Sequence, residues 1–178
     1  MDPAAWKRQP GQGKYARPER ERRFLLAAAP PLAAPPQTAQ PRLIEDRYLD
    51  GTTLRLRRIT VGGEQVHKLT QKVRLGAGPA EVATTNTYLT PAEYDRLLVL
   101  PAAVLVKTRH LLPVGQTSFV VDEFHGRLAG LWLAEIEVVD LQTPLTLPTW
   151  LGREVSHEEA FSGGSLAGNP PPDPTQLR

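Results

Sequence analysis

The stretch Leu54-Arg55-Leu56-Arg57 alternates apolar and basic side chains, residue by residue. Side chains two apart on a β-strand share a face, so this stretch predicts a strand with leucines on one face and arginines on the other. Two like charges about 7 Å apart repel by about 2 kcal/mol at an effective dielectric near 20. The arginine face therefore calls for a carboxylate or a bound anion beside it.

The same sorting of charge recurs in two other predicted strands. Lys107 and Arg109 share one face of a later strand, and Lys68, Lys72 and Arg74 share a face of the strand that follows Arg57. In each strand the opposite face is mainly apolar. Three strands thus predict a common basic wall.

Acidic side chains are sorted in the same way. Glu19 and Glu21 share a face of the first predicted strand, Glu135 and Glu137 share a face of the last one, and Asp122 lies within an apolar stretch. For any single strand, a charged face can simply point to water. A solvated sheet, however, normally mixes positive and negative side chains on that face. If the strands close into a barrel, the charged faces converge on its interior, where they favour an anion and a divalent cation.

Short runs of strand type, separated by turn signals such as Asp50-Gly51 and Gly62-Gly63, predict a β-rich domain. Two helices are expected, one from the capping sequence Thr90-Pro91-Ala92-Glu93 and one after Ser156-His157-Glu158-Glu159. The predicted strands are Arg17 to Phe24, Arg42 to Leu49, Thr53 to Thr60, Gln65 to Arg74, Ala83 to Leu89, Val104 to Leu111, Thr117 to Phe124 and Leu131 to Leu141.

Composition sets the outer limits. The 178 residues, 40% of them hydrophobic, are enough for one domain. We place this domain at 17–167, between a flexible leader, 1–16, and a disordered tail, 168–178. Gly163-Gly164 is the first signal that predicts a disordered chain. An Ala/Pro tract after Phe24 is expected to be a long connection. A net charge of +2 argues against nucleic acid or membrane binding, and the absence of cysteine fits a cytoplasmic protein.

The first predicted strand contains Glu19-Arg20-Glu21-Arg22-Arg23-Phe24. This segment resembles the Glu-x-Glu-x-Lys signature of the CYTH, or triphosphate tunnel metalloenzyme, superfamily. Further blocks resemble that superfamily in the same order along the chain. They are Tyr48-Leu49, Leu54-Arg55-Leu56-Arg57, Leu69-Thr70-Gln71-Lys72, Lys107-Thr108-Arg109, Asp122-Glu123-Phe124-His125-Gly126, Gly130 to Glu137, and Trp150 to Val155.

The resemblance implies an α+β fold, an eight-stranded antiparallel β barrel or tunnel with a few flanking helices. It implies Mg²⁺- or Mn²⁺-dependent hydrolysis of inorganic triphosphate, nucleoside triphosphates or thiamine triphosphate, with attack by a water that a carboxylate aligns. The implied metal ligands are Glu19, Glu21, Asp122, Glu135 and Glu137; the phosphate-binding residues are Arg55, Arg57, Lys72, Lys107 and Arg109; and the catalytic residues are Glu135, Glu137 and Arg23.

Two departures from the superfamily pattern keep other functions open. Arg23 replaces a lysine, and the segment that commonly reads Arg-x-Glu-x-Glu is here Ala83-Thr84-Thr85-Asn86, without acids. A module of the same fold that binds a polyphosphate or nucleotide without hydrolysing it is therefore the first alternative. An enzyme that cyclises ATP is the second, although no adenine-specific signal supports it.

Overall fold

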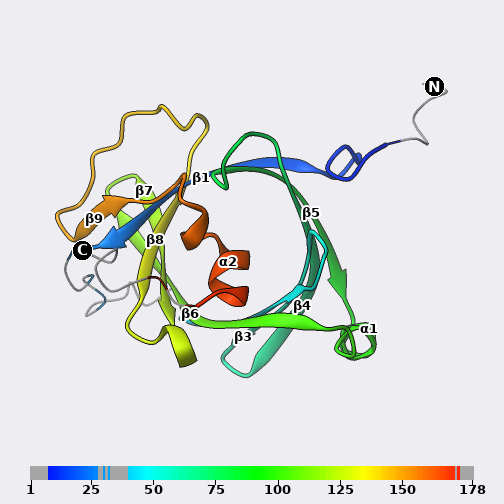
Figure 1. The fold of residues 1–178 in the computed structure, drawn as a ribbon. Helices are drawn as coiled ribbons and strands as arrows, with labels where there is room; N and C mark the ends of the chain where they lie inside the picture. The colour runs from blue at the N-terminus through cyan, green and yellow to red at the C-terminus, as the bar shows by residue number, and fades with distance from the viewer. Residues whose placement is uncertain (1–7, 28–29, 31, 33–39, 171, 173–178) are drawn as a thin grey trace.

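A computed structural model describes residues 8–27, 30, 32, 40–170 and 172. Eight antiparallel strands follow one another around a closed barrel in the order β5-β4-β3-β2-β6-β7-β8-β1, and β1 pairs with β5 to close it (Figure 1). The predicted eight-stranded barrel is confirmed. The strands are β1 Arg17–Leu26, β2 Arg42–Leu49, β3 Leu54–Val61, β4 Glu64–Arg74, β5 Glu81–Leu89, β6 Ala102–Val114, β7 Thr117–Phe124 and β8 Trp132–Glu137.

The turn between β3 and β4 shows why the chain folds back where the sequence predicts. Gly62 and Gly63 both have positive φ angles, 56° and 90°. Side chains with a Cβ rarely adopt this region, whereas two-residue hairpin turns that match the twist of the strands require it. The hairpin then fixes the register, which places Arg57 opposite Lys68.

The outer face of β1, β7 and β8 is apolar and is covered by the segment that follows β8. Phe119 and Trp150 pack edge to face there, with ring centroids 5.7 Å apart. A ninth strand, β9 Leu151–Glu154, pairs with β1 in this layer and was not predicted. The predicted strand to Leu141 is too long: β8 ends at Glu137, and a turn at Asp140 follows, where the backbone N–H of Thr143 donates to the Asp140 carbonyl.

Helix α1, Pro91–Leu97, begins where predicted. The Thr90 hydroxyl accepts from the backbone N–H of Glu93, and the Glu93 carboxylate accepts in return from the backbone N–H of Thr90. This reciprocal capping satisfies two N–H groups that an α-helix otherwise leaves unpaired. Among the described residues, no helix is both long enough and apolar enough to cross a membrane.

The second helix starts later than predicted. Ser156 does not cap a helix, because its hydroxyl accepts from the backbone N–H of Arg23 and donates to Glu154. A 3-10 turn, η3 Glu159–Phe161, comes first, and α2 follows at Gly163–Gly168 with Ser162 as its cap. The prediction that Gly163-Gly164 opens a disordered tail is wrong, since both glycines lie in this helix.

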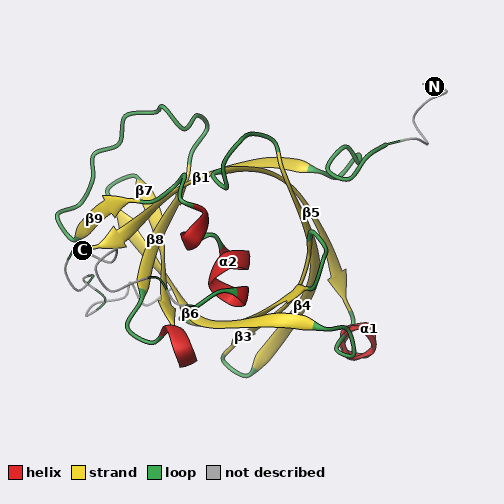
Figure 2. Cartoon of the chain, in the orientation of Figure 1, coloured by secondary structure: helices red, strands yellow, loops and turns green. Residues whose placement is uncertain are grey.

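Helix α2 lies inside the ring of strands and not on its outside (Figures 1 and 2). Its Leu166 and Ala167 join a buried cluster with Leu105, Phe124 and Leu133. Each of these three residues lies two positions from a charged residue of the interior, Lys107, Asp122 or Glu135, and so shares its face of the strand. Helix α2 therefore packs on the inward face of the barrel. The remainder of the predicted tail, 171 and 173–178, lies outside the described residues, as do residues 1–7 of the predicted leader.

The glycine at the start of α2 is required by a close approach to β2. A Cβ on Gly163 would lie 2.0 Å from the hydroxyl oxygen of Tyr48, whereas a Cβ on Gly164 would lie 3.7 Å from the Tyr48 ring, an ordinary contact. The first distance is far inside van der Waals contact. Tyr48 or the helix must move if Gly163 gains a side chain.

We therefore expect Gly163→Ala to lower the free energy of unfolding by about 1–3 kcal/mol, as overpacking does, while Gly164→Ala has little effect or stabilises the helix. Urea denaturation of both variants measures the difference. Equal stability of the two would contradict the close packing of α2 against β2.

Candidate active site

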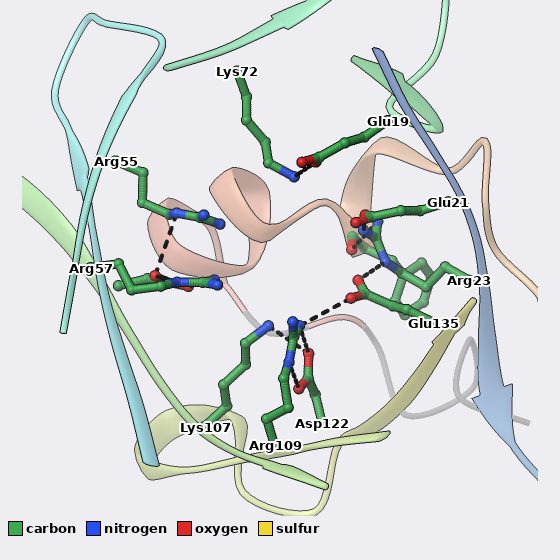
Figure 3. Close-up of polar contacts among 12 residues, drawn as sticks. Glu19, Glu21, Arg23, Arg55, Arg57, Lys72, Lys107, Arg109, Asp122 and Glu135 are labelled. Atoms are coloured by element: carbon green, nitrogen blue, oxygen red, sulfur yellow. Dashed lines mark hydrogen bonds and ion pairs between the residues drawn. The ribbon is translucent and has the colours of Figure 1, made fainter. Parts of the chain in front are cut away.

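The interior of the barrel contains a cavity of about 540 Å³ lined by charged side chains (Figure 3). The lining brings together most of the residues that the sequence indicated: Glu19, Glu21, Arg23, Arg55, Arg57, Lys72, Lys107, Arg109 and Glu135. Asp122 lies directly behind Lys107 and Arg109 and is 1% exposed. Glu137 is exposed at the end of β8, beyond the residues that line the cavity.

Asp46 of β2 holds the two arginines of β3. Its carboxylate accepts from Arg57 Nε at 2.5 Å and from Arg57 Nη2 at 2.7 Å, and the Nε of Arg55 lies 3.5 Å away. Burial by itself would raise the pKa of Asp46, but Arg55 and Arg57 outweigh it and hold the pKa well below its ordinary value. Asp46 is therefore a buried anion that fixes the direction of Arg57.

Sequence reasoning missed Asp46. It follows Glu45, so the charge pattern alone did not say which of the two acids points inward. The available signal was the spacing of Asp46 from Ile44 and Tyr48, because side chains two apart on a strand share a face. The structure places Asp46 inward and leaves Glu45 outside, paired with Arg58.

On the neighbouring strands, Asp122 of β7 joins the two basic residues of β6. Lys107 donates to it at 2.5 Å, and Arg109 donates to both of its oxygens at 2.8 Å. Burial would raise the pKa of Asp122, but Lys107 and Arg109 lower it below the ordinary value. Burial lowers the pKa of Lys107, although Asp122 opposes that shift. Both oxygens of Asp122 are thus already occupied.

Arg23 connects the wall formed by β6, β7 and β8 to the 3-10 turn η3, which precedes α2. Its Nε donates to Glu135 at 2.7 Å, its Nη1 donates to the carbonyl of Phe161 at 3.1 Å, and its Nη2 lies 3.6 Å from Glu21. Arg109 donates to the second oxygen of Glu135 at 3.1 Å. Burial would raise the pKa of Glu135, yet the nearby cations hold it well below its usual range.

The wall formed by β1, β4 and β5 contains Thr84 and Asn86, which stand where the superfamily pattern has acids. Glu19 accepts from Lys72 at 3.0 Å and from the hydroxyl of Thr84 at 2.9 Å. Asn86 accepts from Thr70 at 2.7 Å. Thr84 and Asn86 line the cavity, so neutral groups face the interior where the superfamily pattern has acids.

Other residues line the cavity without having been assigned to the site, among them the polar or charged residues Lys68, Arg74 and Tyr48. Lys68 and Arg74 lie on the face of β4 that also carries Lys72, and Tyr48 lies beside Gly163. Arg74 forms an ion pair with Glu159 of η3. The alternation along β4 had already placed Lys68 and Arg74 inward, but they fall outside the blocks that carry the family resemblance.

The donors for a divalent metal lie on the wall formed by β1 and β8. Glu21 stands directly opposite Glu137 in the strand register, and Glu135 lies two residues away on the same face. Carboxylate oxygens of this kind suit Mg²⁺ and Mn²⁺. In the described residues no three His, Asp or Glu side chains converge as a ready metal site, because Glu135 turns toward Arg23 and Arg109. A hard cation at this wall would therefore require Glu135 to turn away from Arg23 and Arg109.

Comparison with known proteins gives one partial sequence match. An inorganic triphosphatase of Acetivibrio thermocellus is 36% identical over 67 residues, which is 38% of this chain and 43% of that protein. The match thus spans less than half the length of this relative. No protein-family model matches the chain.

Solved structures match over most of the chain. The inorganic triphosphatase NE1496 superposes with a TM-score of 0.57 at 22% identity, over 86% of this chain and 96% of that one. The PH1819 protein from Pyrococcus horikoshii superposes with a TM-score of 0.53 at 18% identity, over 70% of this chain and 80% of that one. Likeness at this level of identity establishes the fold.

Fold and interior together define the class: a closed antiparallel β tunnel with a charged lumen. The chain has the eight-stranded tunnel fold that the resemblance to the CYTH, or triphosphate tunnel metalloenzyme, superfamily implies, so this fold prediction is confirmed.

Asp46→Asn should destabilise the fold by about 3–5 kcal/mol, because it removes the carboxylate between buried cations. Glu45→Gln is the matched control, since Glu45 pairs with the exposed Arg58 and should change stability by less than about 1 kcal/mol. Urea denaturation gives both values. A loss in the Asp46 variant no larger than in the control would show that this carboxylate is dispensable.

The depressed pKa values of Asp46, Asp122 and Glu135 predict acid sensitivity. A carboxyl whose pKa is lower in the folded chain stabilises the fold fully above its unfolded pKa of about 4, and that stabilisation is lost as the pH falls. The urea midpoint should therefore decrease steadily below about pH 4. Asp46→Asn should make this decrease shallower, and an unchanged slope would assign it to other groups.

Proposed function

We propose that the chain hydrolyses a triphosphate-containing small substrate with the help of a divalent metal. The observation that carries this proposal is the charge of the lumen: eight basic and four acidic side chains line the cavity, and Asp46 and Asp122 lie behind them. Two positive charges remain in excess among the described residues. A polyanion of several phosphoryl groups neutralises such an excess.

The basic side chains are proposed to bind the phosphate oxygens. Arg55, Arg57 and Arg109 present forked N–H donors, which match two phosphate oxygens at once, and Lys72 and Lys107 act as compact charges. Their partners Asp46, Asp122 and Glu19 hold most of them in place before a substrate arrives. Little reorganisation is then needed when the substrate binds, which favours catalysis by preorganised charge.

The carboxylates of β1 and β8 are proposed to bind the metal and to position the attacking water. Glu21, Glu135 and Glu137 form the donor set, while Glu19 and Asp122 are also predicted ligands that would first have to release their cations. Mg²⁺ or Mn²⁺, when bound, lowers the pKa of a coordinated water and neutralises charge on phosphate oxygens. Arg23 is proposed to orient Glu135 through their hydrogen bond and to neutralise charge in the transition state.

The comparisons support the same chemistry, since the sequence relative and one of the superposed structures are both inorganic triphosphatases. Inorganic triphosphate is therefore the first substrate to test, with nucleoside triphosphates and thiamine triphosphate beside it.

Purified protein should release phosphate from inorganic triphosphate only when Mg²⁺ or Mn²⁺ is present. Glu137→Gln should raise the metal concentration needed for half-maximal rate by about 10- to 100-fold or abolish release, because it removes one metal donor. Glu135→Gln should abolish release, since it also frees Arg23 and Arg109. Glu123→Gln, on the outer face of β7, is the control and should leave the rate unchanged. Metal-independent release, or full activity of both lumen variants, would reject the assignment.

A binding module without hydrolysis is the second candidate, and the neutral β5 wall favours it. Thr84 and Asn86 face the cavity and are held by Glu19 and Thr70. If the module only binds, calorimetry should detect binding of inorganic triphosphate while no phosphate is released over the same period with either metal.

A further inference from the structure

The surplus positive charge of the lumen is confined to one place. Lys72 forms an ion pair with Glu19, and Arg74 forms one with Glu159. The positive charges at the C-terminal end of β4 are therefore neutralised. The wall of β1, β6, β7 and β8 is balanced as well, because its three cations meet three carboxylates: Arg23, Lys107 and Arg109 against Glu21, Asp122 and Glu135.

Three cations on β3 and β4 share a single carboxylate. Asp46 faces Arg57 and Arg55, and no carboxylate in the described part of the chain lies within ion-pair distance of Lys68. Lys68 stands directly opposite Arg57 in the register of β3 and β4. Both excess charges of the lumen therefore lie in this group of Arg55, Arg57 and Lys68.

Arg55 has hydrogen-bonding capacity to spare. Its Nε is buried without a hydrogen-bond partner, and the 3.5 Å between this nitrogen and Asp46 exceeds a normal N–H···O distance. Its Nη2 reaches Thr70 only at 3.5 Å. A buried donor without an acceptor is costly, so an anion that accepts from Arg55 gains affinity.

Lys68 is held at the cavity by an aromatic ring and not by an acid. It is half-buried, and its ammonium lies 5.5 Å from the ring centre of Tyr88, its neighbour across β4 and β5. A cation over a ring is stabilised without losing its charge. Burial lowers the pKa of Lys68, and Arg57, Arg55 and Arg109 lower it further, as expected for a cation that lacks an anionic neighbour.

We infer that Lys68 is a phosphate-binding residue and that it forms, with Arg55 and Arg57, a subsite that binds a phosphoryl group without a divalent metal. The inference rests on the proposed function. It adds to that function one phosphate-binding residue, Lys68, and an order in which the anion and the metal bind. The anion can bind at β3 and β4 first, because that wall lacks negative charge. The metal is assigned to the opposite wall, where the proposed donors Glu21, Glu135 and Glu137 lie.

The test is calorimetric titration of the full chain with inorganic triphosphate, first in EDTA and then with Mg²⁺. Binding in EDTA is expected. Lys68→Met, which keeps the apolar stem and removes the charge, should weaken that binding by about 10- to 100-fold, as loss of a charged hydrogen bond does. Lys68→Arg should restore most of the affinity.

Arg58→Met is the matched control. It removes one positive charge from the same hairpin, but Arg58 points outward and pairs with Glu45. Its affinity for triphosphate should stay within about twofold of the parent, because exposed charges are screened by solvent and salt.

The outcomes separate this inference from the proposed function. Binding in EDTA that Lys68→Met weakens and Arg58→Met does not would support the subsite. Binding that appears only with Mg²⁺, or that Lys68→Met leaves unchanged, would overturn it while metal-dependent hydrolysis stands. Absence of triphosphate binding in both conditions would instead reject the proposed function.

Discussion

Most charged groups in the lumen are stabilised by a partner of opposite charge. An isolated ion taken out of water loses several kcal/mol of hydration, which its partner returns only when the geometry is good. The barrel meets this condition by placing basic and acidic strands in register. Asp46 is opposite Arg57, and Asp122 is opposite Arg109. The polar interior is thus largely a set of cross-strand ion pairs, and its excess positive charge remains only in the group of Arg55, Arg57 and Lys68.

This constraint also explains the closing segment. The residues from Val155 to Ala167 bring a second apolar cluster against the inner wall, although the rest of that wall is charged. Two arginines hold the middle and the end of this segment. Arg23 donates to the carbonyl of Phe161, and Arg127 donates to the carbonyls of Leu166, Ala167 and Asn169. A short helix with two glycines has little stability of its own, so these contacts and the Tyr48 approach define its position.

Much of the barrel could be predicted, because alternation of apolar and charged residues is a property of the strand itself. The pattern of Leu54 to Arg57 survives in the structure with the arginines inward. Glycine pairs failed as a guide at Gly163-Gly164, since a glycine marks a close approach as readily as a flexible tail. Asp46 was missed, and Lys68 was placed on the charged face of its strand but not assigned to the site, for a different reason. Their roles arise from which strand lies next to which, and a single sequence does not state the strand order.

The distribution of charge has a consequence for how the two ligands of a metal-dependent triphosphatase would influence each other. The excess cations lie on β3 and β4, whereas the proposed metal-binding carboxylates lie on β1 and β8, so a phosphate chain between the walls would face opposite charges at its two sides. Anion bound at the basic wall raises the negative potential near Glu21 and Glu137, and so strengthens cation binding there. Linkage requires the reverse effect to be of equal size. Under the proposed function, the two walls would therefore couple metal and substrate binding through the substrate's own charge.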